Sequence, residues 1–307
     1  MPELYVPITL PDMFTLARVR LVEAINWIGS PPAHWQGGVQ YDADCTEVSV
    51  TVSPCVSGVS VPVSPAKAST WSRTTRGSRA FTIYDEADCS PVGDWYDVGQ
   101  QKVLRALTQS GPTQVERTFW SGTSGATPHV IYPNLSSTGP VLDETGRITL
   151  QPAGTIISGA PLDVVEGLNR LEETFGACYD GLGLIHVPLG LINSLCAKSL
   201  IYEENGIIRT WAGNRIVVGW GYPTNVGPGG TTPPGGSTWM WATSPVFGIR
   251  GRVQNFDPVQ SFDRGVNTAK FIAEQTHLLG WTCCRVGVLV TTGGEQSGEP
   301  LTPLQDT

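Results

Sequence analysis

Three carboxylates cluster at the end of an alternating segment, at Asp85, Glu86 and Asp88. Neighbouring carboxylates can transfer protons between substrate and solvent, or they can hold a divalent cation. More often such a cluster lies on a solvated loop or faces arginines across an interface, and this is the simpler interpretation here. The arginines that precede the cluster are Arg73, Arg76 and Arg79.

Other residues with catalytic potential lack the spacing that a catalytic site needs. Ser124 lies in Gly122-Thr-Ser124-Gly125, which fails the G-x-S-x-G pattern of a nucleophile elbow. The glycines at 219–221 and 227–236 have neither the Lys-Ser/Thr of a phosphate loop nor the full dinucleotide pattern. His186 lies in an apolar segment, which favours a hydrogen-bonded core residue over a general base. The sequence therefore predicts no enzyme and no cofactor.

Tryptophan is frequent, with 10 residues, and two of them share one face of an expected strand, Trp239 and Trp241. Aromatic side chains at this spacing can stack on a sugar ring, so a carbohydrate-binding module remains an alternative. Packing within a sheet explains the pair more simply.

The 7 cysteines and 4 histidines show no metal-binding spacing, because no two cysteines form a C-x-x-C pair. We predict no metal site. The segment Met1 to Pro7 has neither a basic region nor a long apolar run, so we expect no signal peptide. We expect the protein to be made and kept in a cytoplasm. In that compartment the cysteines should be reduced, mostly buried thiols, with Cys283-Cys284 inside a strand.

The composition favours a folded chain with extensive contacts to other molecules. The 307 residues are 40% hydrophobic, which is enough for a core, but only 15% are charged. A surface with so little charge suggests burial against other copies. The net charge of −8 argues against a nucleic-acid binder, and no apolar run approaches the roughly 20 residues of a membrane span.

Patterning predicts an α+β order rather than strict alternation of strands and helices. A Ser/Pro/Val-rich stretch at 30–75 predicts an extended arm, and 76–93 a hairpin or projecting loop. Gly111-Pro112 should kink or divide the longest helix. The expected helices cover 12–28, 95–120, a segment opened by Pro161 and ended by Gly176, and one opened by Pro188. The expected strands cover 147–150, 184–187, two segments in 207–221, 238–243, 246–253, 268–274 and 286–290.

This order of elements resembles the major capsid protein of tailed bacteriophages, the Hong Kong-type fold that encapsulin shells share. The sequence is most similar in character to the capsid proteins of phages that infect actinobacteria. The segments that carry the resemblance are Gln114–Gly122, Leu184-Ile-His-Val-Pro, Trp211–Gly219 and Asp263–Gln275. The resemblance implies an N-terminal arm at 1–75, an extended loop at 76–94, and a spine helix with the first part of a peripheral domain at 95–160. It further implies an apical domain at 161–235 and returning strands with a C-terminal tail at 236–307.

The resemblance implies a structural subunit that self-assembles into the icosahedral head of a tailed double-stranded DNA phage. Its partners would be other copies in pentamers and hexamers, a portal, and scaffold or decoration proteins. Packaged DNA would be held only non-specifically, and assembly would occur in the host cytoplasm to give a virion. The interface residues expected on this basis are Arg73, Arg76, Arg79, Asp85, Glu86, Asp88, Trp95, Trp211 and Trp220.

Besides a phage tail or decoration protein, two alternatives remain open from the sequence. An encapsulin-like nanocompartment shell would have the same fold and enclose a cargo enzyme. A sugar-binding module or hydrolase would use the tryptophans and the acidic cluster, and it would be a monomer or a small oligomer.

Overall fold

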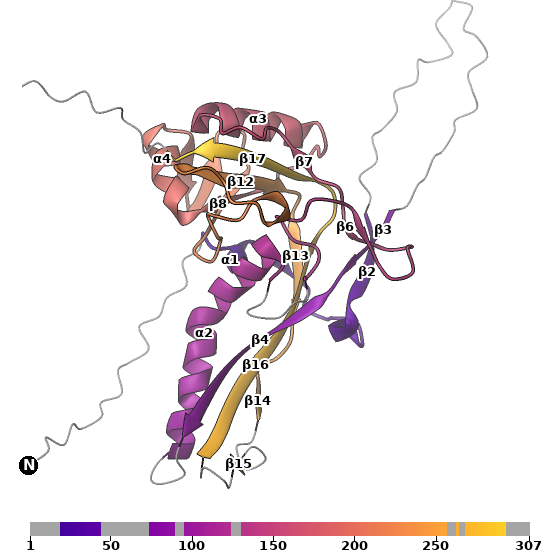
Figure 1. Cartoon of the computed structure of the whole chain (residues 1–307), viewed down its shortest axis with the longest axis vertical. Coiled ribbons are helices and arrows are strands. Elements are labelled where there is room, and N and C mark those ends of the chain that lie inside the picture. Colours follow the sequence, from indigo (N-terminus) through magenta and orange to yellow (C-terminus); the bar gives the residue numbers. More distant parts are fainter. Residues whose placement is uncertain are drawn as a thin grey trace, which may run out of the picture.

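The computed structural model describes residues 19–43, 74–89, 95–123, 130–256, 262–263 and 268–292. Much of the predicted arm and nearly all of the C-terminal tail lie outside these residues. Figure 1 shows a broad upper body and a long, narrow lower part, in which a helix runs beside two long strands. No helix in the described part of the chain is long and apolar enough to cross a membrane.

A seven-stranded mixed sheet forms the upper body, with strand order β7-β17-β12-β8-β11-β10-β9. Helix α3 covers one face of it (Figure 1). The elements are β7 (Thr155–Ile156), α3 (Val164–Gly176), β8 (Leu184–Pro188), the 3-10 turn η2 (Leu189–Leu191), α4 (Ile192–Ala197), β9 (Ile201–Glu204), β10 (Ile207–Thr210), β11 (Arg215–Gly219), η3 (Pro228–Gly230), β12 (Ser237–Thr243) and β17 (Arg285–Thr291).

Helix α3 packs through one apolar stripe, as its periodicity predicts. Val164, Leu168 and Leu171 are buried against the sheet. The helix begins at Val164 rather than at Pro161, because Asp163 is the residue that caps it. The Oδ1 atom of Asp163 accepts a hydrogen bond from the backbone N–H of Val165 at 2.9 Å.

A six-stranded sheet forms the spine of the lower part, and its central strand is the 14-residue β16. β16 pairs along its length with β4 on one side and with β13, β14 and β15 on the other. The elements are α1 (Leu21–Ala24), β1 (Asn26–Trp27), β4 (Ala80–Cys89), α2 (Trp95–Ser121), β13 (Val246–Arg250), β14 (Gln254–Phe256), β15 (Phe262–Asp263) and β16 (Thr268–Trp281).

Helix α2 confirms the predicted long helix, and it is continuous through Pro112. The prediction that Gly111-Pro112 divides it is wrong. Proline removes one backbone hydrogen bond, but the helix packs on β4 and β16 on both sides of this point. Val103 and Leu107 before the proline, and Val115 after it, belong to one buried cluster with these strands.

Two local predictions at the N-terminal side are wrong. Among described residues of the predicted helix 12–28, only Leu21–Ala24 is helical, and Asn26–Trp27 pairs with β13 instead. Of the hairpin or projecting loop predicted for 76–93, the hairpin is absent from the described part, because β4 pairs with the distant β16 from Ala80 to Cys89. The projecting loop stays a prediction. A strand's partner depends on tertiary packing, which local alternation does not encode.

A small third sheet lies beside the junction of the other two, in the order β2-β3-β6-β5. Its strands are β2 (Val39–Ala43), β3 (Thr74–Ser78), β5 (Val141–Leu142) and β6 (Thr149–Gln151), and the 3-10 turn η1 (Trp35–Gly37) precedes them. Trp35 is buried. Part of the predicted arm is therefore integrated into the folded body.

The described chain crosses directly from one large sheet to the other at 244–245 and again at 282–284. β12 and β17 therefore pair with each other in the upper sheet, where β12 also pairs with β8. Cys283 and Cys284 lie in the second crossing, not inside a strand as predicted.

The prediction of reduced thiols is also wrong. Cys178 and Cys284 form a disulfide with their Cα atoms 6.1 Å apart, and Cys283 is disulfide-bonded too. Cys196 is a free, exposed cysteine. The packing of α3 over β17 brings Cys178 and Cys284 together across 106 residues of sequence, which no local pattern reveals.

Candidate functional site: exposed faces and the buried junction that positions them

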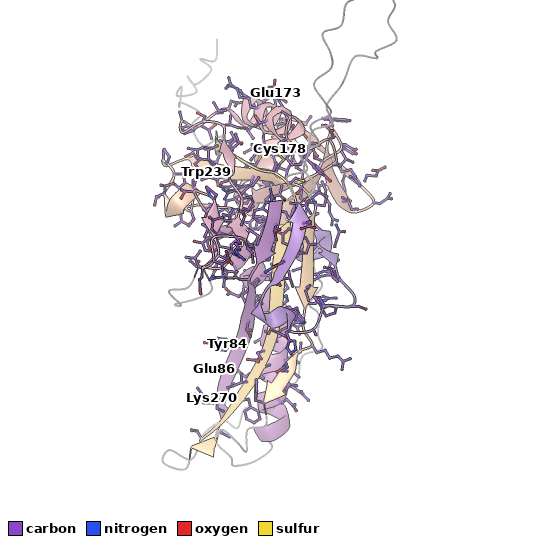
Figure 2. All side chains as sticks on the ribbon, turned by 90° about the vertical axis from the view of Figure 1, so that its right-hand side faces the viewer. Tyr84, Glu86, Glu173, Cys178, Trp239 and Lys270 are labelled. Atoms are coloured by element: carbon purple, nitrogen blue, oxygen red, sulfur yellow. A yellow bond between two sulfur atoms is a disulfide. The ribbon has the colours of Figure 1, made fainter. Side chains whose placement is uncertain are left out.

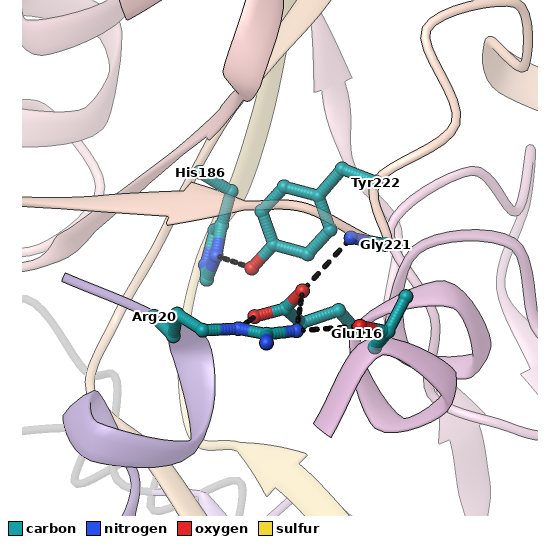
Figure 3. A network of polar contacts seen from close by, with 6 residues as sticks. Arg20, Glu116, His186, Gly221 and Tyr222 are labelled. Carbon is teal, nitrogen blue, oxygen red and sulfur yellow. Dashed lines mark hydrogen bonds and ion pairs between the residues drawn. The ribbon is translucent and has the colours of Figure 1, made fainter. Parts of the chain in front are cut away.

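A buried ion pair joins the lower helix to the upper body (Figure 3). Arg20 donates from Nε to Glu116 Oε1 at 2.9 Å and from Nη2 to Oε2 at 2.8 Å. Arg20 Nη2 also donates to Thr113 Oγ1, and the backbone N–H of Gly221 donates to Glu116 Oε2, each at 2.9 Å. The exposed fractions of the two charged side chains are 1% and 0%. Paired charges with this many hydrogen bonds tolerate burial.

The ion pair connects three segments that are distant in sequence: the entry to α1, the last third of α2, and the turn after β11. Trp220 covers it from outside, with its ring 4.9 Å from the Arg20 guanidinium carbon. Sequence analysis missed this network. One signal was available, because Glu116 is a charged residue beside the apolar Val115 and Phe119 of the long helix.

His186 lies next to this junction as a core residue, as predicted. Its Nδ1 is 2.9 Å from Tyr222 Oη, and its Nε2 is 2.9 Å from Thr243 Oγ1. Figure 3 shows the first of these contacts. Full burial lowers the pKa of His186 to about 3, so the imidazole is neutral in the folded chain near neutral pH. Burial also raises the pKa of Tyr222, and the Glu116 carboxylate adds to this shift.

The two tryptophans of β12 are packed inside the protein. Trp239 and Trp241 stack at 5.8 Å between ring centroids, and their exposed fractions are 5% and 0%. Neither presents a face on which a sugar could stack. The two tryptophans that suggested a sugar-binding module are therefore not accessible to a sugar.

The predicted acidic cluster lies on β4, far down the lower part (Figure 2). Glu86 is exposed and pairs with Lys270 Nζ of β16 at 3.2 Å. Asp88 is exposed and directly opposite Lys270 in the strand pairing, while Asp85 is half-buried. Within the described residues, no three His, Cys, Asp or Glu side chains gather as a metal site would require. The carboxylates therefore form a charged strip along an exposed strand.

The three predicted arginines have different positions. Arg73 lies outside the described residues. Arg76 donates from Nη1 to the carbonyl oxygens of Thr282 and Cys283, the latter at 2.9 Å, and so holds the second crossing within its own chain. Arg79 is exposed on the short link between β3 and β4. The structure therefore does not bring Arg76 to the carboxylates of β4 within one chain.

The three predicted tryptophans also differ in position and exposure. Trp95 is the first residue of α2, and its side chain is not among the parts that the structure describes. Trp211 is 73% exposed at the turn between β10 and β11, where its Nε1 donates to the Ser199 carbonyl at 2.8 Å. Trp220 is 47% exposed and covers Arg20. Trp211 is thus a rigidly held, exposed aromatic side chain, which is typical of an interface.

Large apolar side chains are exposed at both ends of the molecule. Near the Trp211 turn of the upper body they include Leu182, and at the lower sheet they include Tyr84 and Phe256. Their exposed fractions are 58%, 63% and 46%. These side chains are accessible to another molecule at both places.

Comparison with known proteins identifies the fold. No protein-family model matches the sequence, and no curated protein is significantly similar to it. The capsid of an empty GTA particle computed with C5 symmetry has a TM-score of 0.53 at 9% identity, covering 92% of this chain and 100% of that chain. The chain has the Hong Kong-type capsid fold. The confirmed α+β prediction includes the long helix, the buried strand at 184–188 and the long returning strand.

The same fold is found in another kind of shell. The holo-SrpI encapsulin complex from Synechococcus elongatus PCC 7942 has a TM-score of 0.52 at 10% identity, covering 96% of each chain. The capsid of a native GTA particle has a TM-score of 0.52 at 11% identity, covering 94% of this chain and 96% of that chain. Each of the three matches covers more than nine tenths of this chain, so the Hong Kong-type fold extends over nearly all of it.

Proposed function

We propose that the chain is a major capsid protein, a non-enzymatic subunit that assembles into the icosahedral head of a tailed double-stranded DNA bacteriophage. The observation that carries the proposal is the near-complete match to the capsid of a GTA particle, with 92% of this chain and 100% of that chain covered. A fold built for shells explains why the chain exposes apolar side chains at both ends.

The mechanism is repeated association of identical subunits. Head-to-tail contacts between copies close into rings, here pentamers and hexamers. Each stable interface buries more than about 1,000 Å². In this proposal the turn that carries Trp211 contacts neighbours within a ring, and the strip of Glu86 and Asp88 faces arginines of other copies. Arg73 and Arg79 are the candidates for those arginines, and the predicted arm and loop lie over neighbouring subunits.

The wider partners belong to the same proposal. They are a portal, scaffold or decoration proteins, and double-stranded DNA as non-specific contents. With a net charge of −8, the subunit repels DNA phosphates, so the genome is confined without tight binding. Assembly would occur in the host cytoplasm, and the product is the virion.

An encapsulin-like shell is the second candidate, because the SrpI encapsulin matches with a TM-score of 0.52. The disulfide between Cys178 and Cys284 favours the virion. Disulfides persist in oxidising surroundings and are rare in a cytoplasm. A phage particle leaves its host, whereas a nanocompartment stays inside. Particle contents discriminate between the two, since a virion holds DNA and an encapsulin holds a cargo protein.

Negative-stain microscopy and light-scattering mass of the purified full chain test the proposal. Closed shells, or rings of five and six subunits, are expected. Reversing the charge of the strip with Glu86→Lys and Asp88→Lys should reduce the yield of particles, while Glu173→Lys on exposed α3 serves as the matched control. A monomer of 32.9 kDa that persists at high concentration contradicts the proposal.

A further inference from the structure

The disulfide between Cys178 and Cys284 joins the end of α3 to the crossing between β16 and β17. Its two sulfur atoms differ in access. Cys178 is exposed on the upper body, where Figure 2 labels it, whereas Cys284 is 2% exposed. A reagent in solution can therefore reach the bond from the Cys178 side only.

The crossing at 282–284 is bonded to the other crossing between the same two sheets. The backbone N–H of Cys283 donates to Ser244 Oγ at 2.9 Å, and the N–H of Ser244 donates to the Cys284 carbonyl at 3.3 Å. Arg76 of β3 donates to the Cys283 carbonyl at 2.9 Å. All three sheets thus meet at this point, and the disulfide adds a covalent link from α3 to it.

A shell subunit made in a cytoplasm meets reducing conditions until the particle is released, which rests on the proposed function. We propose that Cys178 and Cys284 stay as thiols during assembly and close afterwards by exchange with a small-molecule disulfide that enters at Cys178. The closed bond locks the meeting point of the three sheets.

The exchange is balanced in two steps. The Cys178 thiolate attacks one sulfur of the small disulfide, forms a mixed disulfide and releases one small thiolate. The Cys284 thiolate then attacks Cys178 Sγ, the protein disulfide forms, and the second small thiolate leaves. The protein is oxidised by two electrons and loses two protons, and the small disulfide is reduced to two thiols.

The effect on stability follows from the length of the closed loop. The bond spans 106 residues, so it removes much of the freedom of the unfolded chain. For a chain of this size we expect closure to raise the midpoint of thermal unfolding by about 5–10 °C.

Peptide mass spectrometry of the full chain tests the order of events. Cells are lysed in a denaturant that contains N-ethylmaleimide, so that the buried Cys284 is also accessible to the reagent, and both Cys178 and Cys284 should carry the alkyl group. Unalkylated particles are then treated with oxidised glutathione, and the Cys178–Cys284 peptide pair should appear. In Cys284→Ser the reaction should stop with glutathione on Cys178. Cys196→Ser removes the free, exposed thiol found among the described residues and should leave closure unchanged.

Thermal unfolding tests whether the closed disulfide stabilises the fold. The midpoint of glutathione-treated wild type is compared with that of Cys178→Ser. A bond already closed in the alkylated lysate overturns the proposed order. Failure to close with oxidised glutathione overturns the exchange, and equal midpoints overturn the lock. Closure in subunits that never form shells would leave the chemistry intact and contradict the proposed function instead, so the two failures are distinguishable.

Discussion

Arg20 and Glu116 form a two-pronged ion pair that is closed to solvent, with N–O distances of 2.9 and 2.8 Å. The pair fixes the N-terminal segment and the upper part of α2 to the turn at Gly221, so it sets how the lower part joins the upper body (Figure 3). Removing one partner leaves the other charge buried without compensation, which costs more than the pair itself contributes.

Glu116→Gln or Arg20→Met should therefore lower the free energy of unfolding by about 3–5 kcal/mol. Replacing both residues with apolar ones of similar volume should recover part of that loss, because no charge then remains buried. Denaturant unfolding of the three variants measures the difference. The exposed pair Arg170–Glu166 on α3 is the control, and Glu166→Gln there should change stability by no more than about 0.5 kcal/mol. Equal effects at both sites would contradict the argument.

Acid should destabilise the fold through buried histidines. The pKa of His186 is lowered to about 3 and that of His277 to about 4, in both cases mainly by burial. The unfolded chain therefore binds more protons than the folded chain as pH falls below the ordinary histidine pKa of about 6.5. Stability is complete above that pH and falls steadily as pH decreases toward the folded values. At pH 5 each histidine should cost roughly 2 kcal/mol.

Unfolding free energies at pH 7.5 and pH 5 measure this effect. His186→Gln lowers stability at both pH values, since it loses packing, but its pH-dependent loss should be about half that of the wild type. His34→Gln, at an exposed histidine, should keep the full loss. An unchanged pH dependence in His186→Gln would show that the imidazole is not buried as a neutral group.

Helix α3 contains two glycines that should respond oppositely to alanine. A Cβ atom at Gly167 would overlap Val290 Cγ1 of β17, whereas one at Gly176 would meet no atom within 4 Å. Gly167→Ala should thus force α3 away from the sheet and lower stability by about 1–3 kcal/mol. Gly176→Ala should be neutral or stabilise by up to about 1 kcal/mol, since alanine is the better helix former. Thermal unfolding of the pair decides, and equal shifts would contradict close packing at Gly167.

The elements that the sequence predicted well are those whose burial follows a simple period. The stripe Val164, Leu168, Leu171 predicts α3, and the run at 184–188 predicts a strand buried at every position. The order of such elements was sufficient to suggest the capsid fold. The helix at 95–120 was equally clear, apart from the expected break at Pro112.

The features that sequence reasoning missed depend on contacts between distant segments. Nothing near Ala80 indicates that β4 pairs with β16 rather than folding into a hairpin, and nothing near Cys178 indicates Cys284. Arg76 was grouped with neighbouring arginines as an interface residue, yet it binds carbonyls of the crossing at 282–283. Such long-range choices are made by the packing of whole sheets, and local patterns do not carry them.

Substitution of Trp211 should change assembly while leaving the folding of the subunit almost unchanged. It is 73% exposed, and within its chain it contacts Tyr202 with ring centroids 5.0 Å apart and donates to the Ser199 carbonyl. Trp211→Ala removes little buried surface from the subunit, so the free energy of unfolding should change by less than about 1 kcal/mol. An interfacial tryptophan commonly contributes 2 kcal/mol or more to association, so the yield of rings or shells should fall about tenfold or more.

Light scattering and negative-stain counts at matched concentration measure this loss of assembly. Trp211→Tyr keeps an aromatic ring and a hydrogen-bond donor, and it should retain most of the wild-type yield. If Trp211→Ala assembles as well as wild type while remaining folded, the turn between β10 and β11 does not contact a neighbouring subunit. The apolar side chains of the lower sheet, Tyr84 and Phe256, would then be the next surface to substitute.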